Sequence, residues 1–159
     1  MRPPILALDP GSREAGMAVF KEDELRYFAN ISLPRQLPAK TLLKRNHFLV
    51  LKLIDKFQPE IVVISRKRLR SPLLESLARQ IKETARSRRL EVVEYNLAEI
   101  KQVLCPPGKS TRQQLTAQLV ARYPVLRHAC AQPTPWQASY RQRMFDAIAA
   151  GYAHMRKHR

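Results

Sequence analysis

Short apolar runs and amphipathic stretches alternate along the chain, and this pattern predicts a mixed α/β fold. Ile5 to Leu8 form an apolar run closed by an Asp-Pro-Gly turn, which is typical of a buried central strand. Two further strands are predicted over 15–21 and 25–31, with polar residues between them that suit a hairpin. A β-branched segment at 60–65 predicts a strand covered on both faces, and a last strand spans 90–95.

Helices are predicted where apolar residues recur at helical spacing or where a capping pattern begins a segment. Ser71 and Pro72, Asn96 with Glu99, and Ser110 with Gln113 provide three such starts. The predicted helices cover 39–57, 72–88, 97–105, 111–123 and 142–156. The segment 124–140 contains three prolines and no apolar period, so we expect a loop there. This order of elements predicts a mixed sheet with helices on both faces, folded as a single domain over 1–159.

The charge of the chain is strongly unbalanced. Lys and Arg total 29 against 13 Asp and Glu, for a formal net charge of +16. Such a field attracts polyanions, and nucleic acid is the commonest partner of this kind. An anionic membrane surface is a weaker alternative, because no predicted helix is both basic and strongly apolar on its other face.

The two cysteines, Cys105 and Cys130, form no CxxC pair. Neither a zinc site nor a disulfide framework is therefore indicated, and two free thiols suit a reducing compartment. The first apolar run is too short for a signal sequence, and no run is long enough to span a membrane. We expect a cytoplasmic protein that does not enter the membrane.

Three segments resemble the RuvC-type Holliday-junction resolvases, which belong to the RNase H-like superfamily. ILALDPGSREAGMAVF resembles the first two strands of that family, and MFDAIAAGYAH resembles its last helix. YNLAEIKQVLCPPGKSTRQQL, between them, resembles the stretch that leads through a basic loop into a helix. The similarity extends from residue 1 to about residue 155. It implies an RNase H-like fold, a five-stranded mixed sheet flanked by helices.

The resemblance also implies an acidic metal site. Asp9, at the end of the first strand, and Asp146, in the last helix, match two of the family's catalytic metal ligands. The superfamily cleaves phosphodiesters with Mg²⁺ ions held by clustered carboxylates, which activate water and stabilise the leaving oxygen.

Two further ligand positions of the family are not acidic in this chain. The position of a family Glu is Ser65, and the position three residues before Asp146, usually an acid or a His in the family, is Arg143. We expect the Arg143 guanidinium to occupy the place of a cation and to pair with Asp146, with Asp9 as a second partner. Among other acids, Glu14 in the first hairpin is the best local substitute ligand.

Two functions from different classes follow from this pattern. The first is a nucleic-acid-binding protein with a degenerate nuclease site, in which Mg²⁺ binding is weak or absent. The second is an active Mg²⁺-dependent, structure-selective endonuclease that uses Asp9 and Asp146. A third reading, the YqgF-like branch that processes ribosomal RNA, begins with a comparable strand but matches the later motifs less well.

The expected partner is nucleic acid, most plausibly branched or duplex DNA, and the resemblance suggests a homodimer. DNA and RNA are not distinguished by the sequence itself. The basic residues predicted to contact nucleic acid are Arg66, Lys67, Arg68, Lys101, Lys109 and Arg112.

Overall fold

The computed structural model describes residues 2–34, 36–66, 71–105, 111–130 and 135–158, with the backbone alone described for 130 and 135–140. A five-stranded sheet with the order β3-β2-β1-β4-β5 forms its centre. The strands are β1 (Ile5–Asp9), β2 (Glu14–Lys21), β3 (Glu24–Ser32), β4 (Ile61–Arg66) and β5 (Glu91–Asn96). The first three strands pair in antiparallel fashion, whereas β4 pairs parallel with both β1 and β5. The predicted mixed sheet of five strands is confirmed.

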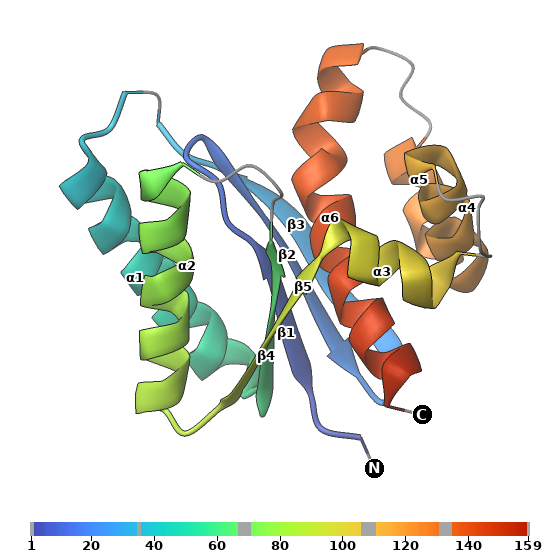
Figure 1. The fold of residues 1–159 in the computed structure, drawn as a ribbon, viewed down its shortest axis with the longest axis horizontal. Coiled ribbons are helices and arrows are strands. Elements are labelled where there is room, and N and C mark those ends of the chain that lie inside the picture. Colours follow the sequence, from blue (N-terminus) through green and yellow to red (C-terminus); the bar gives the residue numbers. More distant parts are fainter. Residues whose placement is uncertain (1, 35, 67–70, 106–110, 131–134, 159) are drawn as a thin grey trace.

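Helices cover both faces of this sheet (Figure 1). One face carries α1 (Ala39–Phe57) and α2 (Pro72–Ser87). The other carries α3 (Leu97–Leu104), α4 (Arg112–Arg122), α5 (Arg127–Cys130) and the long α6 (Pro135–Lys157).

Alternate residues of the central strand divide the core into two clusters. Leu6 and Leu8 pack with the α1–α2 side, while Ile5 and Ala7 pack with the α6 side. Side chains alternate between the faces of a strand, so Asp9 falls on the α6 side. All five residues of β1 are buried. The alternating direction of the side chains along β1 thus decides that the carboxylate at its end faces α6.

The caps of the helices largely follow the predicted patterns, with one correction. Ser71 caps α2, and Asn96 with Glu99 forms the predicted capping box of α3. For α4, the prediction of Ser110 with Gln113 is wrong, since the box is formed by Thr111 and Gln114. The segments S-T-R-Q and T-R-Q-Q both satisfy the capping-box pattern, so local sequence alone does not choose between them.

The loop predicted over 124–140 is also wrong in part. Pro124–Leu126 forms a 3₁₀ turn, η1, α5 follows it directly, and α6 begins at Pro135 rather than near residue 142. Several prolines without an apolar period favour a loop, but η1 and α6 each begin with a proline. There, proline removes no hydrogen bond that the helix would otherwise make.

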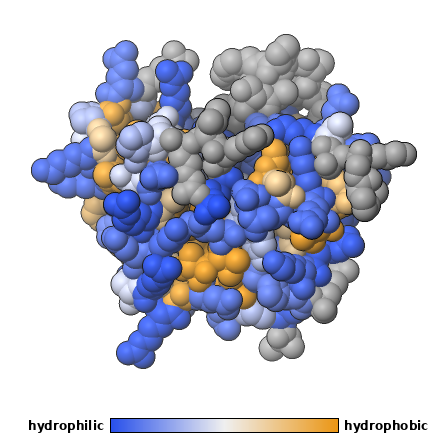
Figure 2. Space-filling view, in the orientation of Figure 1, coloured by the Kyte–Doolittle hydropathy of each residue, from blue (hydrophilic) through white to orange (hydrophobic). Residues whose placement is uncertain are grey.

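Hydrophilic residues cover most of the face of the molecule seen in Figure 2, with small hydrophobic patches between them. Cys105 is a buried free cysteine, and the side chain of Cys130 lies outside the described residues. Within the described ranges, none of the helices combines the length and the apolar character needed to cross a lipid bilayer.

Candidate nuclease centre and nucleic-acid interface

Asp9 and Ser65 lie side by side at the end of the sheet where the parallel strands β1 and β4 finish, which is called the acidic edge below. Leu8 pairs with Ile64 in parallel register, so Asp9 and Ser65 follow at the same level on neighbouring strands. Both residues are buried, Asp9 with no exposed area. Ser65 pairs in turn with Tyr95 on β5. The predicted position of the missing family Glu is therefore adjacent to Asp9.

Arg143 of α6 lies against this edge. Its Nη1 is 3.7 Å from Asp9 Oδ1, and its Nε is 3.9 Å from Glu14 Oε1. The same Nη1 donates a 3.0 Å hydrogen bond to the carbonyl of Pro10. The side chain of Arg143 is 22% exposed, whereas that of Asp9 is fully buried. One guanidinium therefore connects the end of β1, the turn that follows it and the start of β2.

Two glycines of the β1–β2 hairpin make room for Arg143. A Cβ atom at Gly11 would lie 2.3 Å from the backbone oxygen of Glu14 and 2.5 Å from both Cζ and Nε of Arg143. A Cβ atom at Gly16, which pairs with Asp9, would lie 2.0 Å from the Arg143 carbonyl oxygen. The hairpin thus accommodates the guanidinium at one glycine and the helix backbone at the other.

Asp146 has a different arginine partner. Arg112, the first residue of α4, donates a 2.9 Å hydrogen bond from Nη1 to Asp146 Oδ1. Gln142, one turn earlier on α6, donates to the same oxygen at 3.0 Å. The Asp146 side chain is 5% exposed and that of Arg112 is 43% exposed. The expected pairing of Arg143 with Asp146 is therefore wrong, because Arg112 holds that carboxylate, whereas the expected second contact, between Arg143 and Asp9, is present.

The arrangement offers few ligands to a divalent cation. In the part of the chain that the structure describes, no group of three or more His, Cys, Asp or Glu side chains is arranged to hold a metal ion. Mg²⁺ normally uses several oxygen ligands in near-octahedral geometry. Each of the two predicted ligands also has a cationic side chain within 4 Å.

Glu94 does not join the site, because it faces the other side of the sheet. It forms ion pairs with Lys82 of α2 and, at 3.1 Å, with Arg66. Burial by itself would raise the pKa of Glu94, but Lys82 and then Arg66 lower that pKa below its usual value. Glu94 is therefore the charged partner of two cations on the α2 side.

The predicted nucleic-acid-binding residues lie in different surroundings. Arg66 pairs with Glu94, and Arg112 pairs with Asp146 while leaving part of its guanidinium exposed. Lys101 is half-buried near the end of α3. Lys67, Arg68 and Lys109 lie outside the described residues. The contact between Arg112 and Asp146 joins positions 34 residues apart, and no local pattern in the sequence indicates it.

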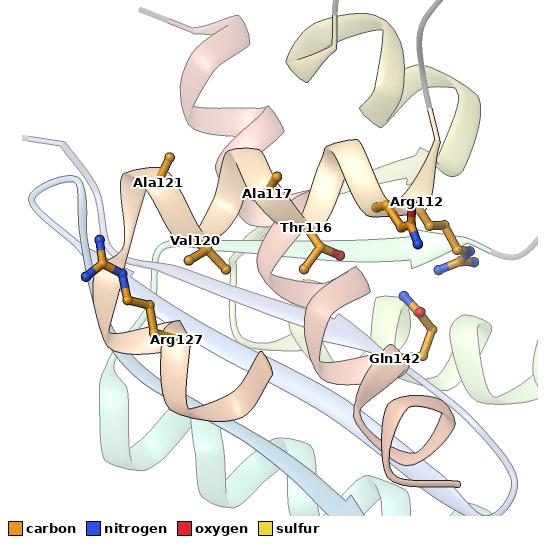
Figure 3. A pocket seen from close by; sticks show the side chains of 8 residues that line it. Arg112, Thr116, Ala117, Val120, Ala121, Arg127 and Gln142 are labelled. Carbon is orange, nitrogen blue, oxygen red and sulfur yellow. The ribbon is translucent and has the colours of Figure 1, made fainter. Parts of the chain in front are cut away.

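A cavity of about 580 Å³ is lined in part by the two residues that hold Asp146. Arg112 and Gln142, the two partners of Asp146, stand at one end, and Arg127 at the other (Figure 3). The side chains between them are small or apolar: Thr116, Ala117, Val120 and Ala121. Arg112 therefore lines an open cavity while it pairs with a buried acid.

Comparison with known structures shows the same fold in junction resolvases. The structure of Thermus thermophilus RuvC in complex with a Holliday junction substrate matches with a TM-score of 0.78 at 19% identity, covering 99% of this chain and 96% of that chain. A second Thermus thermophilus RuvC structure gives 0.76 at 20% identity, covering 98% and 95%. The yeast mitochondrial Holliday junction resolvase gives 0.67 at 13% identity, covering 96% and 77%. No curated protein sequence matches the chain.

A family-level match covers nearly the whole sequence. Residues 5–154 match the family described as crossover junction endodeoxyribonuclease RuvC. The matched region begins at the first residue of β1 and includes Asp9, Ser65, Arg143 and Asp146. This match confirms the resemblance found in the sequence, and the chain belongs to the RuvC family of crossover junction endodeoxyribonucleases.

Proposed function

We propose that this protein binds branched or duplex DNA through a RuvC fold whose metal-dependent cleavage site is degenerate. The observation that carries the proposal is the pairing of each predicted metal ligand with an arginine. Asp9 lies against Arg143, and Asp146 is hydrogen-bonded by Arg112. The residues present do not fit a two-metal site, and no cleavage step is assigned to them.

Electrostatics gives the physical reason. At ~5 Å and an effective dielectric constant of ~20, two unit charges interact by about 3 kcal/mol, and a divalent ion would be repelled by about twice that amount. An arginine does not lose its proton in proteins, so the repulsion is permanent. Replacing a carboxylate by Ser65 also removes one attractive charge from the same edge.

DNA binding is supported by charge and by fold. The net charge of +16 favours a polyanionic partner. The most similar fold reported above belongs to a RuvC bound to a Holliday junction substrate. A homodimer, suggested by the family resemblance, belongs to the same proposal.

The test is to compare binding and cleavage on the same labelled DNA. We expect the protein to shift a four-way junction and a duplex of the same arm sequence, and to leave both uncut in millimolar Mg²⁺ or Mn²⁺. Light scattering of the same samples measures the oligomeric state. The matched variants are Asp146→Asn and the pair Ser65→Glu with Arg143→Asp. Asp146→Asn should leave the DNA uncut, like the parent protein. Ser65→Glu with Arg143→Asp should introduce metal binding that calorimetry can measure.

A metal-dependent junction endonuclease is the second candidate. It is favoured by Glu14, a third carboxylate that shares Arg143 with Asp9. Metal-dependent cleavage of the junction that is abolished by Asp146→Asn would establish this function and overturn the degenerate site. Absence of any DNA binding at low salt would contradict both candidates.

A further inference from the structure

We propose that Arg143 is a built-in counter-ion, whose guanidinium holds Asp9 and Glu14 in the role that the family resemblance assigns to a divalent metal ion. This inference deepens the proposed function. It rests on one part of that proposal, namely that the site does not bind a metal ion. It concerns how the acidic edge is stabilised, and DNA affinity does not enter it.

The contacts of Arg143 resemble those of a bridging cation more than those of a surface ion pair. Three groups from consecutive parts of the hairpin converge on one guanidinium: the Asp9 carboxylate at 3.7 Å, the Pro10 carbonyl at 3.0 Å and the Glu14 carboxylate at 3.9 Å. All three offer oxygen atoms, as ligands of a hard cation would. A planar group with five N–H donors can serve several oxygens at once.

The hairpin is also shaped around this side chain. Gly11 stands where a Cβ atom would overlap first the backbone oxygen of Glu14, at 2.3 Å, and then Cζ and Nε of Arg143, both at 2.5 Å. Gly16 allows the backbone of α6 to approach β2 at Arg143 itself. The guanidinium is therefore enclosed by the same turn whose carboxylates it contacts.

Burial explains why Asp9 needs this partner. A fully buried carboxylate is costly to keep charged unless it is paired or hydrogen-bonded. In a metal-dependent relative a bound ion could provide that charge. Here the charge is part of the chain, so the folded state should depend neither on the concentration of divalent metal nor on its removal.

A double-mutant cycle measures the coupling between the two charges. Arg143→Gln should lower the Tm by roughly 6 °C or more, because it removes a cation that contacts a fully buried carboxylate. In the Asp9→Asn background the same substitution should lower the Tm by less than half as much, because there is no buried charge to compensate. Each variant is unfolded by heat with EDTA and with millimolar Mn²⁺.

The response to Mn²⁺ is the second measurement. Arg143→Gln should regain several degrees of Tm on addition of Mn²⁺, because its carboxylates are now open to a cation. The parent protein and the double variant should shift by no more than the control. The control is Arg88→Gln, which removes an arginine from an exposed ion pair with Asp55.

Each outcome decides the proposal. Equal losses of Tm in the two backgrounds, or equal Mn²⁺ responses in the parent and in Arg143→Gln, would overturn it. If Arg143→Gln does not fold but the double variant does, the charge of Asp9 is the cause and the proposal stands. If neither folds, Arg143 acts by something other than charge compensation and the proposal is wrong.

These results are independent of the proposed function. A protein that shows the coupling but fails to bind a junction would lose only the DNA-binding proposal. A protein that binds the junction but shows no coupling would lose only the counter-ion.

Discussion

Asp9 and Asp146 are paired with two different arginines, and these arginines differ in how far their side chains are exposed to solvent. Arg143 is mostly enclosed by the hairpin, whereas almost half of Arg112 is open to solvent. An exposed guanidinium is screened by water and contributes less to stability than an enclosed one. Arg112 is therefore the better candidate to exchange its carboxylate for a DNA phosphate, and Arg143 is the better candidate for a structural charge.

Gly16 carries a prediction at the same scale. Gly16→Ala should destabilise the fold by roughly 1–3 kcal/mol, because the new Cβ would overlap the backbone of α6 at Arg143. Chemical denaturation measures the loss. Gly151→Ala is the comparator for a clash with a side chain instead of backbone: its Cβ would lie 2.3 Å from the ring of the buried Phe20, so this variant should be destabilised too, although less than Gly16→Ala. A Gly16→Ala protein as stable as the parent would show that α6 does not need this close approach.

At the scale of elements, α6 carries two residues of the candidate site and a buried histidine. Arg143 and Asp146 lie one turn apart in its middle, and His154 lies near its end. His154 is buried, and its Nδ1 is 2.8 Å from the hydroxyl of Tyr95 on β5. This pair connects the end of the helix to the edge strand of the sheet.

His154 should make stability depend on pH. Burial, followed by the charge of His158, lowers the pKa of His154 below its ordinary value, against the opposing effect of Glu91. The unfolded chain then binds a proton more readily than the folded one, so stability is complete above the unfolded pKa of ~6.5 and falls as the pH drops below it.

Urea unfolding between pH 7.5 and 5 tests this dependence. His154→Gln should flatten the part of the curve below pH ~6.5 and should leave the response above it unchanged. His158→Gln removes the neighbouring ring, whose centroid lies 4.4 Å away, and should flatten the curve less than His154→Gln, because the burial of His154 remains. A parent curve that is level through this range would contradict the prediction.

At the scale of the whole molecule, the excess of positive charge should govern DNA affinity. The logarithm of the binding constant should fall steeply with the logarithm of salt concentration, by roughly 0.9 for each phosphate neutralised. With a net charge of +16, we expect several phosphates to be contacted at once.

Fluorescence anisotropy of a labelled junction at several salt concentrations measures this slope. Lys101→Gln should reduce the slope by about one if Lys101 meets a phosphate. Arg88→Gln, whose guanidinium is engaged with Asp55, should reduce it less. A salt response that is flat for the parent protein would remove the electrostatic basis of the proposed DNA binding.

Local pattern was sufficient for most elements of the fold. The strands lie within about a residue of their predicted ranges. The local pattern failed to predict the structure where it was compatible with two different structures. Proline is compatible both with a loop and with the first turn of a helix, and two overlapping segments satisfied the capping pattern of α4.

For the candidate site, the sequence by itself determined which residues were available: Asp9, Asp146, a serine where the family resemblance implied a Glu, and an arginine where it implied an acid or a His. The sequence also determined the large positive charge. The identity of the site residues and the net charge both follow directly from the composition and order of the amino acids. Only the tertiary structure decided the pairing of these charges. Arg112 and Asp146 come from different helices, and Arg143 and Asp9 lie near opposite ends of the sequence. Such contacts depend on how α4 and α6 pack against the sheet, and packing is a collective result that no short segment specifies.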